Sequence, residues 1–96
     1  MVVAVVGLGV FGVSVALKLA DEGAEVFAID LEEEKVRKYA NLVTHAVAAD
    51  VTDKDAMESI GIRNVDVAVI TTASDITMSV MGTMVLKELG IPRVIA

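Results

Sequence analysis

The glycine pattern at the start of the chain limits most strongly what it can fold into. Five apolar residues, 2–6, run directly into Gly7, Gly9 and Gly12, which form a Gly-x-Gly-x-x-Gly sequence. After a buried strand, such a pattern makes a tight turn, lets backbone approach an anion closely and packs the next helix against the sheet. The start of that helix offers free N–H groups and about half a positive charge to a phosphate. The sequence therefore predicts a strand, a phosphate-binding turn and a helix.

The same region has an alternative interpretation as a signal peptide or short membrane span, because no charged residue precedes Lys18. Against this, no Lys or Arg introduces the apolar run, three glycines interrupt it and no stop-transfer pattern follows. We therefore expect no insertion into a membrane. Without a targeting signal, the expected compartment is the cytoplasm.

The composition narrows the class of protein. Hydrophobic residues make up 55% of the 96, but only two Phe and one Tyr are present, so aliphatic side chains and Met must fill the core. This apolar excess suggests that a partner covers part of the surface. A net charge of −6 argues against nucleic-acid binding, and the lack of cysteine excludes disulfides and thiolate chemistry. No spacing typical of a metal site is present.

Segments that predict strands alternate with segments that predict helices. The predicted strands are 2–6, 25–30, 45–49, 65–71 and 93–96, and the predicted helices are 10–22, 32–39, a segment from Thr52 to near Gly61, and 75–89. Thr52 is the expected N-cap of its helix, with Asp55 three residues later. Strands separated by helices imply parallel pairing with right-handed crossovers. We therefore expect one α/β domain over residues 1–96, a Rossmann-like doubly wound parallel sheet.

Ligands of such sheets bind beyond the carboxyl ends of the strands, where the strand order reverses. Asp30 ends the second predicted strand, eighteen residues after Gly12, where a carboxylate can accept hydrogen bonds from both ribose hydroxyls of an adenosine. The same charge repels a 2′-phosphate, which favours NAD or adenine nucleotides over NADP. The alternative is that Asp30 only caps the following helix.

The ends of the next two strands supply further candidates. Asp50 can accept from the exocyclic amine of an adenine and Val51 can contact its ring, although Asp50 is also a plausible plain turn acid. The hydroxyls of the 71–75 segment lack a histidine base, because His45, the only histidine, is expected at the opposite end of the sheet. A nucleophile is therefore not expected.

The helix predicted at 75–89 carries two apolar stripes. One consists of Met78, Met81, Val85 and Leu89, and the other of Ile76, Val80 and Met84. We expect the first stripe to face the sheet, and the second is rotated from it by about a third of a turn or more. A monomer buries one face of a surface helix, so the second stripe predicts a subunit interface. The alternative is a broad core-facing side with single exposed apolar residues.

Several blocks of sequence together resemble the KTN (RCK) nucleotide-binding domain of Trk/Ktr potassium-uptake regulatory proteins. In order, the blocks are 7–16, 25–30, 43–47, 49–53, 61–64 and 86–90. The resemblance covers essentially all 96 residues. It implies a cytoplasmic regulatory subunit that binds NAD(H) or ADP/ATP, forms homo-oligomers (dimers and rings), and gates a membrane potassium channel by rearranging.

The resemblance also assigns roles to residues. Phosphates would be held by Gly7, Gly9, Phe11 and Gly12 with Val10 in the same turn, the ribose by Asp30, the adenine by Asp50 and Val51, and the nucleotide would be flanked by Thr72, Ala73, Ser74 and Asp75. The family often has Arg where this chain has Val10, and losing a charge-assisted phosphate contact costs about 1.5–3 kcal/mol. This departure argues against ATP-specific sensing, whereas NAD still fits. The family also continues beyond the fifth strand, so we expect a sheet truncated near that point.

Two other functions compete with a nucleotide sensor. The cofactor-binding half of an NAD-dependent oxidoreductase would need a substrate domain and an acid/base pair. A purely structural oligomerisation module would leave the glycine turn empty, which the position of Asp30 argues against. We expect a non-enzymatic regulator.

Overall fold

The computed structural model describes residues 1–72 and 75–96, which form a five-stranded, all-parallel sheet. Its strands are β1 (Val2–Val6), β2 (Glu25–Asp30), β3 (His45–Ala48), β4 (Val67–Ile70) and β5 (Arg93–Ile95). They are arranged in the order β3-β2-β1-β4-β5, so the chain crosses from one half of the sheet to the other between β3 and β4. The predicted Rossmann-like doubly wound sheet is confirmed.

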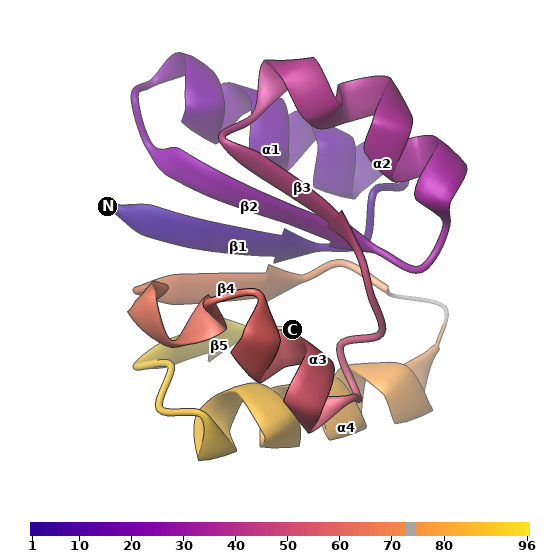
Figure 1. Ribbon diagram of the computed structural model, residues 1–96, viewed down its shortest axis with the longest axis vertical. Coiled ribbons are helices and arrows are strands. Elements are labelled where there is room, and N and C mark those ends of the chain that lie inside the picture. The colour runs from indigo at the N-terminus through magenta and orange to yellow at the C-terminus, as the bar shows by residue number, and fades with distance from the viewer. Residues whose placement is uncertain (73–74) are drawn as a thin grey trace.

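Helices cover both faces of this sheet. They are α1 (Val10–Asp21), α2 (Glu33–Tyr39), α3 (Lys54–Ser59) and α4 (Ile76–Glu88), with short 3₁₀ turns η1 (Ala40–Leu42) and η2 (Ile62–Asn64). Figure 1 shows α1 and α2 on one side of the sheet and α3 and α4 on the other. This division follows because the crossovers are right-handed: the chain moves across the sheet in one direction from β1 to β3 and in the opposite direction from β3 to β5. None of the helices formed by the described residues has the length and apolar character that a membrane crossing requires.

The core consists of two layers, one on each face of the sheet. Along β1, Val3 and Val5 pack toward α1, whereas Ala4 and Val6 pack toward the α3 and α4 side. The second layer is the larger, and Met57 of α3 belongs to it. Both faces of β1 are therefore buried, as expected for the central strand of a parallel sheet.

Several element boundaries differ from the predicted ones. Thr52 is not the N-cap of α3; that residue is Asp53, whose carboxylate accepts from the N–H of Ala56 at 3.1 Å. The Thr52 hydroxyl instead donates to the carboxylate of Asp50 at 2.7 Å, which also accepts the backbone N–H of Thr52. The β4 strand is shorter than predicted, since Val65 closes the η2 turn through an N–H bond to Ile62.

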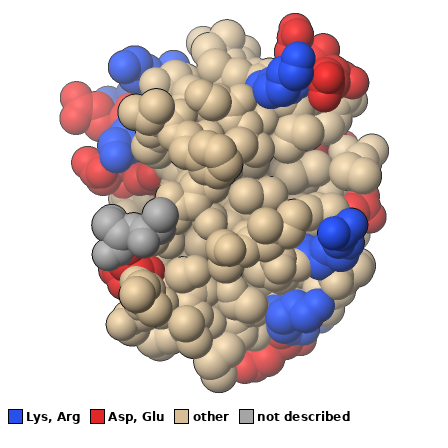
Figure 2. Space-filling model, turned by 180° about the vertical axis from the view of Figure 1, so that it is seen from behind, with Lys and Arg blue, Asp and Glu red and all other residues tan. Residues whose placement is uncertain are grey.

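The orientation of α4 corrects one side-chain prediction. The apolar spacing predicts that Met81 faces the sheet, but its side chain is 48% exposed. The buried residues of α4, Gly82 and Leu86, define the side of the helix that faces the sheet, and Met81 is rotated from Gly82 by about 100° around the helix axis. Met81 therefore joins the outward-facing apolar side chains, which are Ile76, Val80, Met81 and Met84. Figure 2 shows a broad surface without Lys, Arg, Asp or Glu on this view of the molecule, with the charged side chains around its margins.

Candidate functional site

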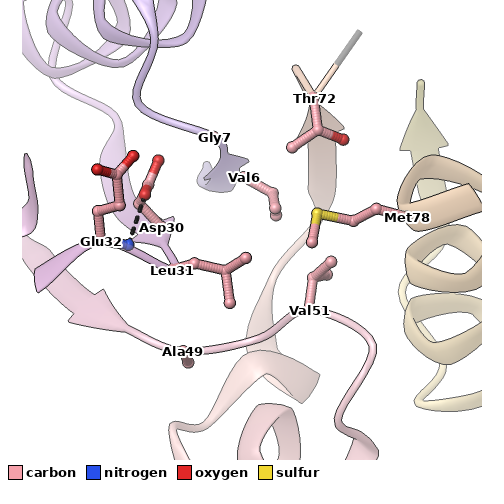
Figure 3. A pocket seen from close by; sticks show the side chains of 9 residues that line it. All are labelled: Val6, Gly7, Asp30, Leu31, Glu32, Ala49, Val51, Thr72 and Met78. Carbon is pink, nitrogen blue, oxygen red and sulfur yellow. Dashed lines mark hydrogen bonds between the residues drawn. The ribbon is translucent and has the colours of Figure 1, made fainter. Parts of the chain in front are cut away.

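A cavity of about 180 Å³ opens at the carboxyl ends of the strands, beside the point where the strand order reverses. It is lined by Val6, Gly7, Asp30, Leu31, Glu32, Ala49, Val51, Thr72 and Met78. These residues come from the ends of β1 and β2, the segments after β3 and β4, and the first turn of α4 (Figure 3). Pockets for whole small molecules measure about 300–1,000 Å³, so this cavity suits one ring or sugar of a larger ligand.

The glycine turn beside the cavity leaves no room for side chains at two of its three glycines. Gly7 has φ +99°, and a Cβ on Gly12 would lie 1.8 Å from the Gly7 carbonyl oxygen. By contrast, a Cβ on Gly9 would meet nothing within 4 Å. Gly9 is the N-cap of α1 and offers no capping side chain, so the first N–H groups of α1 have no acceptor within the helix. The turn thus presents backbone N–H groups to open space.

The hydroxyl of Thr71, the residue directly after β4, supports this turn. The Thr71 hydroxyl donates to the carbonyl oxygens of Val6 and Gly7, at 2.9 and 2.8 Å. The backbone N–H of Thr71 also donates to Val6. A Cβ on either Gly7 or Gly12 would approach Thr71 Oγ1 to 2.6 Å, so both glycines are needed for the hydroxyl to fit.

Asp30 supports the turn from the other side. Its Oδ2 accepts from the N–H of Leu8 at 2.7 Å, and its Oδ1 accepts from the N–H of Glu32 at 2.8 Å. Glu32, not Asp30, is the N-cap of α2. A carboxylate has about four lone-pair sites, so Asp30 retains acceptor capacity toward the cavity that it lines.

Apolar side chains from three segments converge on the cavity. In Figure 3, Leu31 points in from the end of β2, Val51 from the segment after β3, and Met78 from α4. Glu32 borders the same cavity and pairs with Lys35, whose Nζ lies 3.1 Å from the Glu32 carboxylate. The hydrogen bond from Lys35 to Glu32, together with the negative charge of Glu32, holds the pKa of Lys35 above its ordinary value. The cavity is therefore apolar inside with two carboxylates on one side.

The Thr72 hydroxyl, unlike those of Thr71 and Thr52, makes no hydrogen bond within the described residues. Its Oγ1 is buried and has no hydrogen-bond partner among the described residues. Most buried polar atoms in proteins are hydrogen-bonded. Because this oxygen exposes less than 1 Å² of surface, a ligand in the cavity would not contact it without a local shift of Thr72.

The remaining predicted site residues lie around the cavity and not in its wall. Gly9 and Val10 border a second, open hollow between α1 and α2, and Phe11 is exposed on α1. Asp50 accepts both the N–H and the hydroxyl of Thr52, as a turn acid does. Asp75 is the N-cap of α4 and accepts from the N–H of Met78 at 2.9 Å. Ala73 and Ser74 lie outside the described residues.

His45 lies where the sequence predicts, at the opposite end of the sheet. It is the first residue of β3, stacks on Phe27 with ring centroids 4.3 Å apart, and has its Nε2 3.4 Å from a Glu25 carboxylate oxygen. Within residues 1–72 and 75–96, no group of three or more His, Asp or Glu side chains is placed to hold a metal ion.

Sequence reasoning missed several residues that border the site. It named neither Leu31, Glu32 nor Met78 as a cavity residue, and it gave no supporting role to Thr71. For Leu31 and Glu32 a signal existed, since they directly follow Asp30 at the end of a strand. For Thr71, whose partners lie 64 and 65 residues away, the local pattern carried no such information.

A comparison with protein families gives a match over nearly the whole chain. Residues 3–96 match a family model described as the TrkA-N domain. The Ktr system potassium uptake protein C of Bacillus subtilis is 43% identical over 88 residues, which are 92% of this chain and 40% of that protein. The Ktr system potassium uptake protein A of the same species is 44% identical over 91 residues, 95% of this chain and 41% of that protein. The chain thus spans about two fifths of the length of these relatives.

Among solved structures, a similar fold occurs in the NAD(P)-binding domain of an exopolyphosphatase-related protein from Archaeoglobus fulgidus. The two superpose with a TM-score of 0.80 at 27% identity, over 92% of this chain and 65% of the other. This likeness supports the Rossmann-like fold of the chain.

Replacing Thr71 by Val should lower the free energy of unfolding by about 0.5–1.5 kcal/mol, because the Gly7 carbonyl loses its side-chain donor while the Val6 carbonyl keeps the Thr71 N–H. Thr71→Ser keeps the hydroxyl and should lose less. Urea denaturation of the three proteins measures the difference. A Val variant as stable as the Thr protein would show that the hydroxyl does not support the turn.

Proposed function

The chain belongs to the TrkA-N domain family, and on that premise we propose that it is the nucleotide-sensing domain of a cytoplasmic regulator of potassium uptake. In this proposal it binds NAD(H) or ADP/ATP and assembles with copies of itself beneath a membrane potassium transporter. Nucleotide exchange changes the shape of that assembly and so gates transport. The observation that carries the proposal is the junction of a side-chain-free glycine turn, the Asp30 carboxylate and an apolar cavity at the reversal of strand order.

In this proposal, different residues contact the adenine, the ribose and the phosphates of the nucleotide. The adenine end fits the apolar cavity between Leu31, Val51 and Met78. The ribose hydroxyls donate to Asp30. The phosphates lie over Gly9, where backbone N–H groups and the positive end of α1 favour negative charge.

The charge of the site favours NAD and adenine nucleotides over NADP. Asp30 and Glu32 both border the cavity, on the side where the ribose lies in this proposal. A 2′-phosphate placed there would be repelled by about 4 kcal/mol for each pair of unit charges 4 Å apart at an effective dielectric constant of about 20. Lys35 offsets part of the Glu32 charge, since the two are paired.

The chemistry of the cavity supports a regulator in preference to an enzyme. Among the described residues that line it, the ionisable side chains are Asp30 and Glu32, and Asp30 is engaged with two backbone N–H groups. The Thr71 hydroxyl is committed to the glycine turn. Binding and release, together with a surface that assembles, are sufficient for a sensor.

Titration with NAD, NADH, ADP and ATP, followed by thermal unfolding, tests nucleotide binding directly. A ligand at a hundredfold excess over its Kd should raise stability by about 2.7 kcal/mol, and NADP should give a much smaller shift. The Gly9→Glu variant is the control: its new side chain enters open space, so the fold persists, but its charge repels the phosphates. The proposal fails if none of the nucleotides stabilises the protein, and the charge argument fails if NADP binds as tightly as NAD.

The ribose role of Asp30 predicts a dependence on the ligand's own hydroxyl. In the unaltered protein, 2′-deoxy-ADP should bind about tenfold or more weakly than ADP, because a hydrogen bond to a charged acceptor is worth about 1.5–3 kcal/mol. In Asp30→Asn the difference between the two ligands should shrink, while the remaining carbonyl oxygen still accepts from Leu8. Calorimetric titration measures all four affinities. Glu32→Gln is the matched control, and an equal effect of that change would contradict a specific role for Asp30.

The outward face of α4 is the proposed subunit interface. Ile76, Val80 and Met84 recur every four residues on one side of the helix, and all three are more than half exposed in the single chain. Contiguous exposed apolar surface of this kind is typical of interaction sites. This supports assembly through α4, as the apolar composition of the whole chain also suggests.

Changing Val80 and Met84 together to Glu should convert the assembled protein to monomers, because the charges would be buried without partners. Sedimentation velocity over a range of concentrations measures the size. Leu42→Glu, at another exposed apolar position on η1, should leave assembly intact. A monomeric unaltered chain, or an assembled double variant, would refute the α4 interface.

A further inference from the structure

The inner face of α4 contains one position without a side chain where the helix meets the cavity wall. Met78, Gly82 and Leu86 follow one another at four-residue intervals and face the sheet. Met78 lines the cavity and Leu86 is fully buried in the core. Glycine is an unfavourable residue in the middle of a helix, so its presence between two packed side chains requires a reason.

Val51 supplies that reason. A Cβ on Gly82 would lie 2.8 Å from Val51 Cγ1, 3.3 Å from Val51 Cγ2 and 3.4 Å from Ile70 Cδ1. Contacts below 3.0 Å require a neighbour to move. Here α4 rests directly on the two methyl groups of Val51.

A rotation of the Val51 side chain relieves this contact only in part. Its side chain is β-branched and therefore stiff at χ1. Both methyl groups face Gly82: one of the other two staggered rotamers keeps a methyl at the 2.8 Å position, and the other still leaves a methyl at the 3.3 Å position. Val51 is also only 2% exposed, so the residues around it restrict its side chain as well. An added carbon at position 82 must push α4 outward or push Val51 into the cavity that it lines.

We propose that Gly82 is a positioning residue for the nucleotide cavity: by seating α4 directly on Val51, it fixes the separation of the Val51 and Met78 walls that hold the adenine end. The inference rests on the proposed function, because it assumes that an adenine nucleotide occupies this cavity. It adds a requirement on a residue that does not itself line the cavity.

The test is a double-mutant cycle on the full chain with ADP as the probe. Gly82→Ala should weaken ADP binding by about tenfold or more, since overpacking at a stiff contact displaces its neighbours. Val51→Ala makes room for the new carbon. In the Val51→Ala background, adding Gly82→Ala should therefore change the ADP affinity by less than about threefold.

Two further measurements separate positioning from a general effect on the helix. Thr77→Ala, at an exposed position of α4, raises helix propensity without facing Val51 and should leave ADP binding unchanged. Thermal unfolding without ligand shows whether each variant is folded. If Gly82→Ala alone fails to fold, the double variant should fold and bind ADP like Val51→Ala.

The outcomes distinguish this inference from the function on which it rests. An unaltered chain that does not bind ADP refutes the nucleotide site itself. An unaltered chain that binds ADP, with Gly82→Ala binding equally well, refutes the role of Gly82 alone. Equal losses from Gly82→Ala with and without Val51→Ala, or a double variant that does not fold, also refute it, because Val51 would then not be the group displaced.

Discussion

The rest of the structure depends on how closely α1 approaches the end of β1. The Gly7 carbonyl oxygen occupies the place where a side chain on Gly12 would begin, at a separation of 1.8 Å from that carbon. The first turn of the helix therefore lies directly above the strand end and its N–H groups face the open side of Gly9. Any larger residue at position 12 would move α1, and with it the first N–H groups of the helix, away from the end of β1.

The turn is held by its two neighbouring strands in chemically different ways. The β1 strand lies between β2 and β4 in the sheet. From β2, the Asp30 carboxylate accepts an N–H of the turn, and from the end of β4, the Thr71 hydroxyl donates to its carbonyls. An acceptor on one side and a donor on the other satisfy both kinds of backbone group. Parallel strand order thus brings residues from two distant segments onto one short turn.

The sequence was sufficient for the fold because the relevant signals are local. Alternation of apolar runs with helical segments predicts the parallel sheet, and Gly7, Gly9 and Gly12 predict the turn at the end of β1. The site was predictable only in part. Asp30, Val51 and Thr72 line the cavity as expected of residues at strand ends, whereas Met78 does so because α4 lies over the cavity. The support from Thr71 depends on contacts 64 and 65 residues apart.

Competition between neighbouring polar groups explains the wrong N-cap prediction at the start of α3. Thr52 and Asp53 can each cap a helix. The Asp50 carboxylate accepts the hydroxyl of Thr52, which leaves the N-cap position of α3 to Asp53.

On α4, a regular apolar spacing alone does not identify the inward side. Gly82, which has no side chain, marks the position where α4 lies against Val51 and Ile70, and Met81 beside it points outward.

The double engagement of Asp30 has an evolutionary consequence. The carboxylate that would read the ribose also holds the N–H of Leu8, so ligand preference and the architecture of the turn are not independently mutable. A lineage drifting toward a 2′-phosphorylated cofactor would have to remove this charge, and most replacements would also release the turn. Asparagine, which keeps a carbonyl acceptor and loses the charge, is the natural intermediate on such a route. If Asp30 contacts the ribose as proposed, few substitutions at this position could change the preferred nucleotide without also disturbing the glycine turn.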